Sequence, residues 1–149
     1  CRDDSAPLVE MVLGLMDHLG DDREHFDRNA FLDDAFGNQP QFSVLVAACE
    51  DALVGYALFH PCYEPAFSAR GMYLCDLFVR SPARRAGVGR ALIAAVARAA
   101  REDGRSFVWW VARGDDARAF YRTIAAVEQA ATAHAITFAT FENLAAEAR

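Results

Sequence analysis

The chain has 149 residues and a formal net charge of −6 at neutral pH. A chain of this length buries enough surface to fold without disulfides or metal ions, so we expect a single domain over residues 1–149. The acidic balance argues against a nucleic acid as the main partner. It is compatible with a cationic substrate or simply with a soluble surface. Charged residues interrupt the longest apolar stretches and no signal peptide is visible, so we expect no membrane association and a cytoplasmic location.

The cysteines and histidines are too widely spaced to form a common metal site. The four cysteines are Cys1, Cys49, Cys62 and Cys75, with no C-x-x-C pair, and the four histidines show no H-x-x-x-H spacing. We therefore predict no metal. The cysteines in apolar strands are interpreted as small core residues in a reducing compartment.

The first half of the chain predicts two helices followed by strands. Apolar residues recur at helical spacing from Leu8 to Leu19, with Asp4 or Ser5 as the cap, and a second helix is expected over Glu24 to Phe36. Two strands, Phe42 to Cys49 and Leu53 to Phe59, follow. Pro61 to Ala69 is expected to be a loop.

The second half alternates strands and helices. A strand over Met72 to Val79 precedes an amphipathic helix over Gly87 to Asp103, whose buried face is Val88, Leu92, Val96 and Ala100. The remaining predicted elements are a strand at Phe107 to Ala112, a helix at Asp115 to Ile124, a terminal hairpin of Val127 to Ala131 with Ala135 to Phe141, and a short helix or tail at Asn143 to Arg149. This alternation indicates an α/β layered fold with a mixed sheet.

The most informative segment joins the expected strand at Met72 to Val79 to the expected helix. It contains the pattern Arg84-x-x-Gly87-x-Gly89, and residues 84–90 are called here the 84–90 turn. The two glycines remove Cβ atoms that would keep a ligand away from the backbone. The N–H groups of a helix start favour anions, and the arginines add positive charge. The turn therefore predicts a pyrophosphate site, and the alternative is a helix start that binds no ligand.

Two familiar nucleotide motifs do not match the 84–90 turn. A Walker loop needs Gly-Lys-Ser/Thr, and all fifteen basic residues of this chain are arginine. A dinucleotide fold needs a third glycine, which the residues from Arg90 to Leu92 do not supply. The pattern instead resembles the acyl-CoA-binding motif of the GNAT family of N-acetyltransferases.

The resemblance covers most of the chain. Before the turn stands Tyr73-Leu74-Cys75-Asp76-Leu77-Phe78-Val79, and after it Ala117, Phe120 and Tyr121 are spaced like the A-x-x-F-Y segment of the family. Upstream segments also match, namely Phe31 to Gly37, Leu45 to Ala47, Val54 to Phe59 and Tyr63 to Pro65. Their order is similar to the spermidine/spermine or thialysine acetyltransferase branch.

The resemblance implies both a fold and an activity. The implied fold is α/β, with a mixed, mostly antiparallel central sheet flanked by helices and a splay between the fourth and fifth strands. The usual first strand would precede or include Cys1. The implied activity is direct acetyl transfer from acetyl-CoA, without a metal, to a primary amine of a small molecule such as a polyamine or an amino-acid-like compound. A homodimer is also implied.

The resemblance also implies site residues. Tyr121 matches the tyrosine that protonates the departing thiolate, although an aromatic packing role is the alternative. Asp76 is implied as a ligand of the cationic amine or as a base acting through water. Backbone N–H groups of residues 78–80 are implied as contacts of the pantetheine arm. The implied cofactor contacts are Phe78, Val79, Arg80, Arg84, Arg85, Ala86, Gly87, Val88, Gly89, Arg90 and Phe120.

Several positions depart from the family pattern. Cys75 stands where the branch has a glutamate implicated as general base, and we interpret its thiol as core packing. Strict strand alternation would place Cys75 and Asp76 on opposite faces unless a bulge intervenes. Arg85 stands where the family usually has glycine, and Ala86 is a further mild departure. Ala125-Ala126 replaces a Gly-aromatic or Gly-Ala pair, and Gly114 replaces an asparagine that often helps to hold CoA.

These departures leave two alternatives open. The first is an acyl-CoA-binding module with little or no catalysis. The second is an acetyltransferase whose acceptor is a protein or peptide amine rather than a small molecule. The fold alone does not decide among these activities.

Overall fold

The computed structural model describes residues 5–147. Its helices are α1 (Ser5–Leu19), α2 (Arg28–Phe36), α3 (Val88–Glu102), α4 (Asp115–Arg122) and α5 (Phe138–Glu147), with 3-10 turns at Pro65–Phe67 and Ser81–Ala83. Its strands are β1 (Ser43–Cys49), β2 (Ala52–Glu64), β3 (Ala69–Val79) and β4 (Phe107–Trp109). The expected cap Asp4, the expected first strand at or before Cys1 and the last two residues of the expected tail lie outside the described residues.

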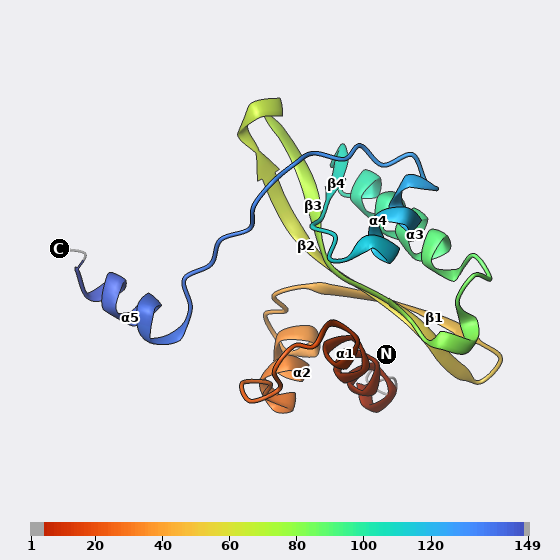
Figure 1. The fold of residues 1–149 in the computed structure, drawn as a ribbon, viewed down its shortest axis with the longest axis horizontal. Helices are drawn as coiled ribbons and strands as arrows, with labels where there is room; N and C mark the ends of the chain where they lie inside the picture. Colours follow the sequence, from red (N-terminus) through yellow and green to blue (C-terminus); the bar gives the residue numbers. More distant parts are fainter. Residues whose placement is uncertain (1–4, 148–149) are drawn as a thin grey trace.

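The described strands form one mixed sheet in the order β1-β2-β3-β4, as expected. The first three strands pair antiparallel, and β4 joins β3 in parallel. Figure 1 shows the sheet as a long curved ribbon with α1 and α2 on one side and α3 and α4 on the other. Among the described residues, the mixed, mostly antiparallel sheet flanked by helices is confirmed.

Two apolar clusters fill the two sides of this sheet. On the α1 side, Leu8 and Met11 are fully buried with Tyr56 of β2. On the α3 side, the helix buries Leu92, Val96 and Ala100, three of the four residues expected on its inner face, whereas Val88 is only partly buried. Each cluster takes alternate residues of β2 and β3, because neighbouring side chains on a strand point to opposite faces.

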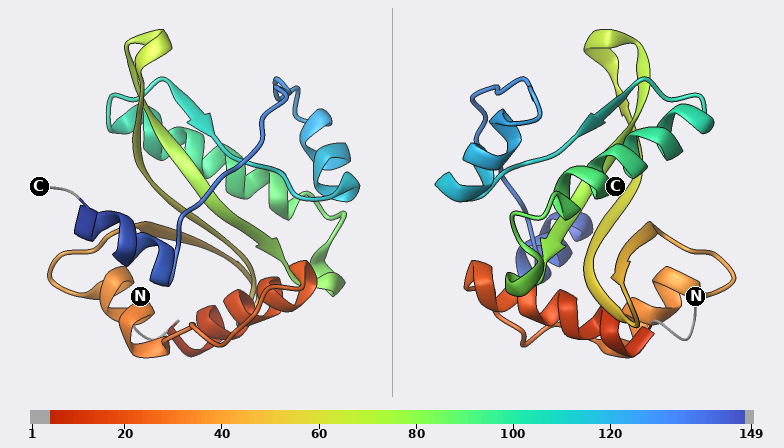
Figure 2. Two further views of the ribbon diagram at one scale, coloured as in Figure 1. Left: turned by 60° about the vertical axis from the view of Figure 1, so that its left-hand side comes forward. Right: turned by 90° about the vertical axis from the view of Figure 1, so that its right-hand side faces the viewer.

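The loop expected at Pro61 to Ala69 is wrong, because β2 and β3 remain paired almost to their connecting turn. The register continues from Pro61 opposite Met72 to Glu64 opposite Ala69. Pro61 is tolerated because the pairing with β1 stops at Phe59, which lies opposite Ser43, the first residue of β1. Beyond Phe59, β2 is therefore an edge strand and needs no N–H donor on its free side. The paired ends project beyond the helices as an arm, visible in both views of Figure 2.

A β-bulge lies within β3 at Cys75. Leu58 pairs with Asp76 and the next residue, Phe59, pairs with Leu74, so Cys75 has no opposite residue. The extra residue reverses the alternation of β3, since Leu74 faces α3 whereas Phe78 faces α1. Cys75 is solvent-exposed, and Cys49 is exposed as well, so interpreting the strand cysteines as core residues is wrong.

The expected splay lies between β3 and β4, the fourth and fifth strands when a first strand is counted before them. Only three residue pairs join the two strands, and the last pair is Tyr73 with Trp109. Beyond Tyr73, β3 continues to Val79 without a β4 partner. The edge of residues 74–79 that faces away from β2 is called here the open edge of β3.

The helices and the C-terminal region differ from expectation in extent. α2 begins at Arg28, later than expected, because the Asp27 carboxylate caps it by accepting from the N–H groups of Asn29 and Ala30 at 2.7 and 3.1 Å. The terminal hairpin expected within residues 127–141 is wrong. Residues 127–137 run extended across the molecule without strand partners, and α5 begins at Phe138 (Figure 1). Alanine recurs through this segment and disfavours strands. In residues 5–147, no helix is long and apolar enough to cross a membrane.

Candidate active site

The 84–90 turn lies beside a pocket of about 540 Å³ on the α3 side of the sheet. Gly87 has a φ of +83°, and a Cβ built on it would meet no atom within 4 Å. A left-handed glycine with open space in front of it lets a ligand approach the first N–H groups of α3. The pocket is lined by Leu77, Val79, Ala83, Arg84, Arg85, Gly87, Val88, Gly89, Arg90, Asp116, Ala117, Ala119, Phe120 and Tyr121.

The arginines of the turn have different contacts. Arg84 donates from Nε to the Val79 carbonyl at 2.9 Å, and its guanidinium lies 5.9 Å from the Phe78 ring centre. Arg85 lines the pocket with a φ of +64°. Arg90 lies on the first turn of α3 and donates to the Thr123 carbonyl at 3.3 Å. Ala86 is exposed and is not among the pocket-lining residues.

The open edge of β3 directs a backbone donor toward the pocket. The Arg80 N–H donates to the Val54 carbonyl at 2.8 Å, so it is engaged with β2. In an antiparallel pair the donors of consecutive residues point to opposite edges, so the Val79 N–H points away from β2. Phe78 places its ring on the α1 side, 6.2 Å from the Tyr56 ring. Of residues 78–80, Val79 is thus the one whose N–H faces the open edge.

Tyr121 reaches the same pocket from α4. Its ring centre lies 4.9 Å from that of Trp110 and 5.2 Å from that of Phe120. Burial raises the pKa of the Tyr121 phenol to about 12, so the phenol is protonated at neutral pH. Gly89 allows α4 to approach, because a Cβ at Gly89 would lie 3.1 Å from Cζ of Phe120. The pocket therefore holds a protonated donor opposite the glycine turn.

Asp76 lies on the other face of β3, toward α1. The buried Tyr56 phenol donates to Oδ2 of Asp76 at 3.0 Å. Burial raises the pKa of Asp76, the Tyr56 hydrogen bond lowers it, and the charge of Asp21 raises it again, with a net upward shift. Tyr121 and Asp76, the two residues predicted to be catalytic, therefore approach β3 from opposite faces of the sheet. Asp76 lies in the part of β3 that has no β4 partner.

Cys75 does not replace the missing glutamate as a base. Partial burial and the neighbouring Asp76 carboxylate raise the pKa of its thiol to about 11. A thiol with this pKa is protonated at neutral pH and is a weak proton acceptor. Cys75 also contributes to the upward pKa shift of Tyr73, so Tyr73, Cys75 and Asp76 form one polar group on the bulged part of β3.

Several residues near these groups were not predicted from the sequence. Asp116 places a carboxylate at the border of the pocket. Arg113, just after β4, forms a two-pronged ion pair with Asp21, just after α1, with N–O distances of 3.1 and 2.8 Å. Residues 92 positions apart carry no local spacing signal. Tyr56 is likewise identified as the partner of Asp76 only by the strand register.

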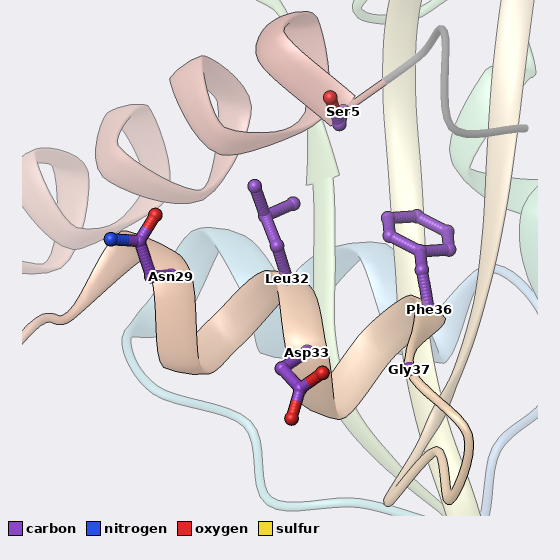
Figure 3. Close-up of a pocket in the computed structure, with 6 residues that line it drawn as sticks. All are labelled: Ser5, Asn29, Leu32, Asp33, Phe36 and Gly37. Carbon is purple, nitrogen blue, oxygen red and sulfur yellow. The ribbon is translucent and has the colours of Figure 1, made fainter.

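A smaller cavity of about 300 Å³ lies between the start of α1 and α2 (Figure 3). Leu32 and Phe36 point toward α1, whereas Asp33 points away from it. The polar side chains that line it are Ser5, Asn29 and Asp33, and no arginine or histidine is among the lining residues. Within residues 5–147, no three His, Cys, Asp or Glu side chains gather closely enough to hold a metal ion.

Relatives were found both by sequence and by structure. Over 85 residues the chain is 36% identical to an L-ornithine N5-acetyltransferase from Arabidopsis thaliana, covering 57% of this chain and 32% of that protein. It is 32% identical over 112 residues to a thialysine N-epsilon-acetyltransferase from Sus scrofa, covering 69% and 65%. The chain thus spans about a third and just under two thirds of these two proteins.

A solved structure shows the same fold. It is a ribosomal-protein-alanine N-acetyltransferase from Brucella melitensis biovar Abortus 2308, with a TM-score of 0.71 and 22% identity, covering 91% of this chain and 94% of that one. The model of the acetyltransferase (GNAT) family matches residues 12–126, which include the 84–90 turn, Asp76 and Tyr121. The chain therefore belongs to the GNAT family of acetyltransferases.

Proposed function

We propose that this acetyltransferase uses acetyl-CoA to acetylate a primary amine of a small molecule. The observation that carries the proposal is the open edge of β3. On one face of the strand lies the pocket lined by the 84–90 turn and Tyr121, and the other face carries Asp76. Two curated relatives are named for acting on ornithine and thialysine, which supports a small amine as the acceptor.

The pocket fits the chemistry of acetyl-CoA. A pyrophosphate needs N–H donors and positive charge without a Cβ in the way, and Gly87, Arg84 and Arg85 offer these at one wall. The apolar Leu77 and Val79 side chains continue the wall along β3 toward Tyr121. When bound, the cofactor supplies an activated acetyl group as a thioester.

The residues of the chain divide the acid–base work of such a transfer. The Val79 N–H is positioned to donate to the carbonyl oxygen that becomes negative when the amine attacks. The protonated Tyr121 phenol is the proton donor for the departing sulfur. Asp76 attracts the cationic acceptor and takes the proton that the nitrogen must lose, directly or through a water.

The first test is calorimetric titration of acetyl-CoA into the wild-type protein and into Gly87→Glu. We expect saturable binding to the wild type and none to the variant, because a carboxylate would stand where the pyrophosphate binds. Gly104→Glu is the matched control, since Gly104 is also left-handed at φ +65° but lies beyond the end of α3. Loss of binding in both variants, or in neither, would contradict the proposed site.

A second test identifies the acceptor class by measuring thiol release with acetyl-CoA and a panel of amines. Turnover with diamines or diamino acids would support the proposal. Tight acetyl-CoA binding without turnover on any amine would select the binding-module alternative, and turnover only with peptides would select the protein acceptor. A cytoplasmic location and a homodimer remain predictions alongside this function.

A further inference from the structure

The Asp21–Arg113 pair joins two segments that border the acceptor side of β3. Asp21 follows α1, and Arg113 lies between β4 and α4, one residue before Gly114. Arg113 also donates to the Leu19 carbonyl at 3.2 Å, which fixes its guanidinium at the end of α1. The pair therefore lies on the α1 side of the sheet, the side that Asp76 faces.

Of the two paired side chains, Asp21 is the one that interacts with Asp76. Asp21 is one of the groups that raise the pKa of Asp76, so the two carboxylates act on the same space. Asp76 itself is held by the buried Tyr56 phenol. This side of β3 thus presents two carboxylates, and the Arg113 guanidinium is paired with one of them, Asp21.

The Arg113 guanidinium retains hydrogen-bonding capacity. A guanidinium carries five N–H donors, and the contacts with Asp21 and Leu19 use one on Nη1 and two on Nη2. The remaining donors, on Nε and Nη1, have no partner within residues 5–147. The side chain is 53% exposed, so a ligand in solution can reach it. A carboxylate is the group that an arginine fork binds best.

We propose that Arg113 and Asp21 bind the α-carboxylate and α-ammonium groups of an amino-acid acceptor, with its distal amine directed toward Asp76. This inference rests on the proposed small-amine acetyltransferase function and specifies the substrate class. The acceptor is then a diamino acid rather than a polyamine, because a polyamine has no carboxylate for the free donors of Arg113 to bind. Arg113 is the residue that distinguishes the two classes.

A purely structural role explains this pair less well. Exposed ion pairs of this kind contribute little to folding stability. Asp21 and Arg113 are 38% and 53% exposed, so the pair is screened by solvent. The unused N–H donors of Arg113 instead suit a negative group on the substrate.

The experiment compares two acceptors that differ only in the α-carboxylate. Ornithine and putrescine are one such pair, and lysine and cadaverine are a second. The wild type, Arg113→Gln and Arg113→Lys are assayed with saturating acetyl-CoA, and KM and kcat are measured separately. Arg118→Gln is the matched control, since Arg118 is a similarly exposed arginine paired with Asp115 on α4.

We expect the wild type to favour the amino acid over its decarboxylated analogue by about tenfold or more in kcat/KM. Arg113→Gln should raise KM for the amino acid by about tenfold and leave kcat/KM for the diamine unchanged or higher. Arg113→Lys should recover part of the loss, and Arg118→Gln should behave as the wild type.

The remaining outcomes distinguish failure of this inference from failure of the proposed function. Equal losses for both acceptors in Arg113→Gln, or none for either, would overturn the role of Arg113 while the enzyme remains a small-amine acetyltransferase. Wild-type turnover with diamines alone would do the same. Absence of turnover with every small amine, despite acetyl-CoA binding, would overturn both.

Discussion

Three departures from the family pattern fall at residues with positive φ. Arg85 and Ala125 have φ values of +64° and +57°, in the left-handed region where glycine is the residue without strain. Gly114 has φ +83° and ψ +162°, a conformation that is essentially restricted to glycine. The backbone thus explains why the family has glycine at the first two positions. It also shows that glycine at position 114 is favoured by the backbone conformation there. The change from asparagine therefore has a conformational reason besides the loss of a side chain that could contact CoA.

The strain at Ala125 gives a stability prediction. Ala125→Gly should raise the free energy of unfolding by about 1 kcal/mol, because the left-handed penalty for a Cβ outweighs the extra freedom of glycine when unfolded. Chemical denaturation measures the change. Ala126→Gly is the control, since Ala126 is not among the residues with positive φ and glycine there should be neutral or destabilising. Destabilisation by Ala125→Gly would contradict the assigned backbone conformation.

Asp76 predicts a trade-off between stability and activity. Its pKa in the folded protein is raised above the ordinary aspartate value of 3.8, so the folded state holds the proton more tightly than the unfolded chain. Stability therefore falls as the pH rises from about 3.8 through the folded pKa, and the loss persists at neutral pH. Asp76→Asn removes this cost and retains an acceptor for the Tyr56 hydroxyl. We expect a higher melting temperature at neutral pH, with the difference disappearing below about pH 4.

The same substitution should lower turnover. An amide neither takes a proton nor attracts an ammonium group, so we expect kcat/KM to fall by about 100-fold. Tyr56→Phe is the companion variant: it keeps the ring in the core but removes the hydroxyl that donates to Asp76. If Asp76→Asn were both less stable at neutral pH and fully active, the roles given to this carboxylate would be wrong.

Tyr121→Phe tests the proton donor. The phenol has a pKa of about 12 and no charge to lose at neutral pH, so phenylalanine should preserve the packing against Trp110. We expect kcat to fall by about 100-fold below about pH 8, where the departing thiolate needs a proton, and by less at higher pH. A pH–rate profile measures this. Unchanged turnover at every pH would reduce Tyr121 to a packing residue.

The site could be predicted only where its residues are local in the sequence. The 84–90 turn and the pair Phe120-Tyr121 lie on continuous stretches whose spacing identifies them. Tyr56, Asp21 and Arg113 contribute through contacts between distant segments, which depend on the strand register and on loop positions. A sequence read alone contains no spacing that links residues 92 positions apart.

At the scale of elements, the bounds of a helix or strand are predictable where apolar residues recur with a clear helical or strand period. α3 was predicted within a residue at each end, because apolar residues recur along one face over four turns. The full length of β2 and β3 is not predicted from the sequence, because Pro61 and the residues that follow it are typical of a loop. The two strands nevertheless remain paired there, with one edge of β2 free. The bulge at Cys75 results from the register between strands, so no spacing within the sequence locates it.

The contact between α3 and α4 gives an element-scale prediction. A Cβ at Gly89 would lie 3.1 Å from the Phe120 ring, so Gly89→Ala should push the start of α4 and Tyr121 away from the pocket. We expect weaker acetyl-CoA binding and a lower kcat. Titration calorimetry and steady-state rates measure the two effects.

The control for this prediction is the double variant Gly89→Ala/Phe120→Leu. The smaller leucine makes room for the added methyl group, so the double variant should recover part of the binding lost by the single one. Additive losses in the double variant would show that Gly89 serves the ligand alone and not the contact between the helices.

At the scale of the whole molecule, the C-terminal segment lies apart from the core. Residues 127–147 are exposed throughout, and the large apolar side chains Val127, Ile136, Phe138, Phe141 and Leu144 are each at least 45% exposed. α5 contacts the preceding structure through Phe138, whose ring centre lies 4.0 Å from that of His25. β4 meanwhile is a sheet edge with Trp109 and the following Val111 exposed. Large apolar side chains exposed in this number along one segment and at a strand edge are typical of surfaces that bind a partner.

These features predict that a second copy of the chain covers the C-terminal segment and the β4 edge. An open strand edge recruits another strand, and an extended segment with apolar side chains is a suitable partner for it. Light scattering after size exclusion should therefore show a dimer for the full chain and a monomer for a chain ending at Ala126. Because residues 127–147 are exposed, the shortened chain should keep the far-UV circular dichroism of the sheet and its acetyl-CoA binding. A monomeric full chain, or unfolding on truncation, would mean that this segment folds back onto its own sheet.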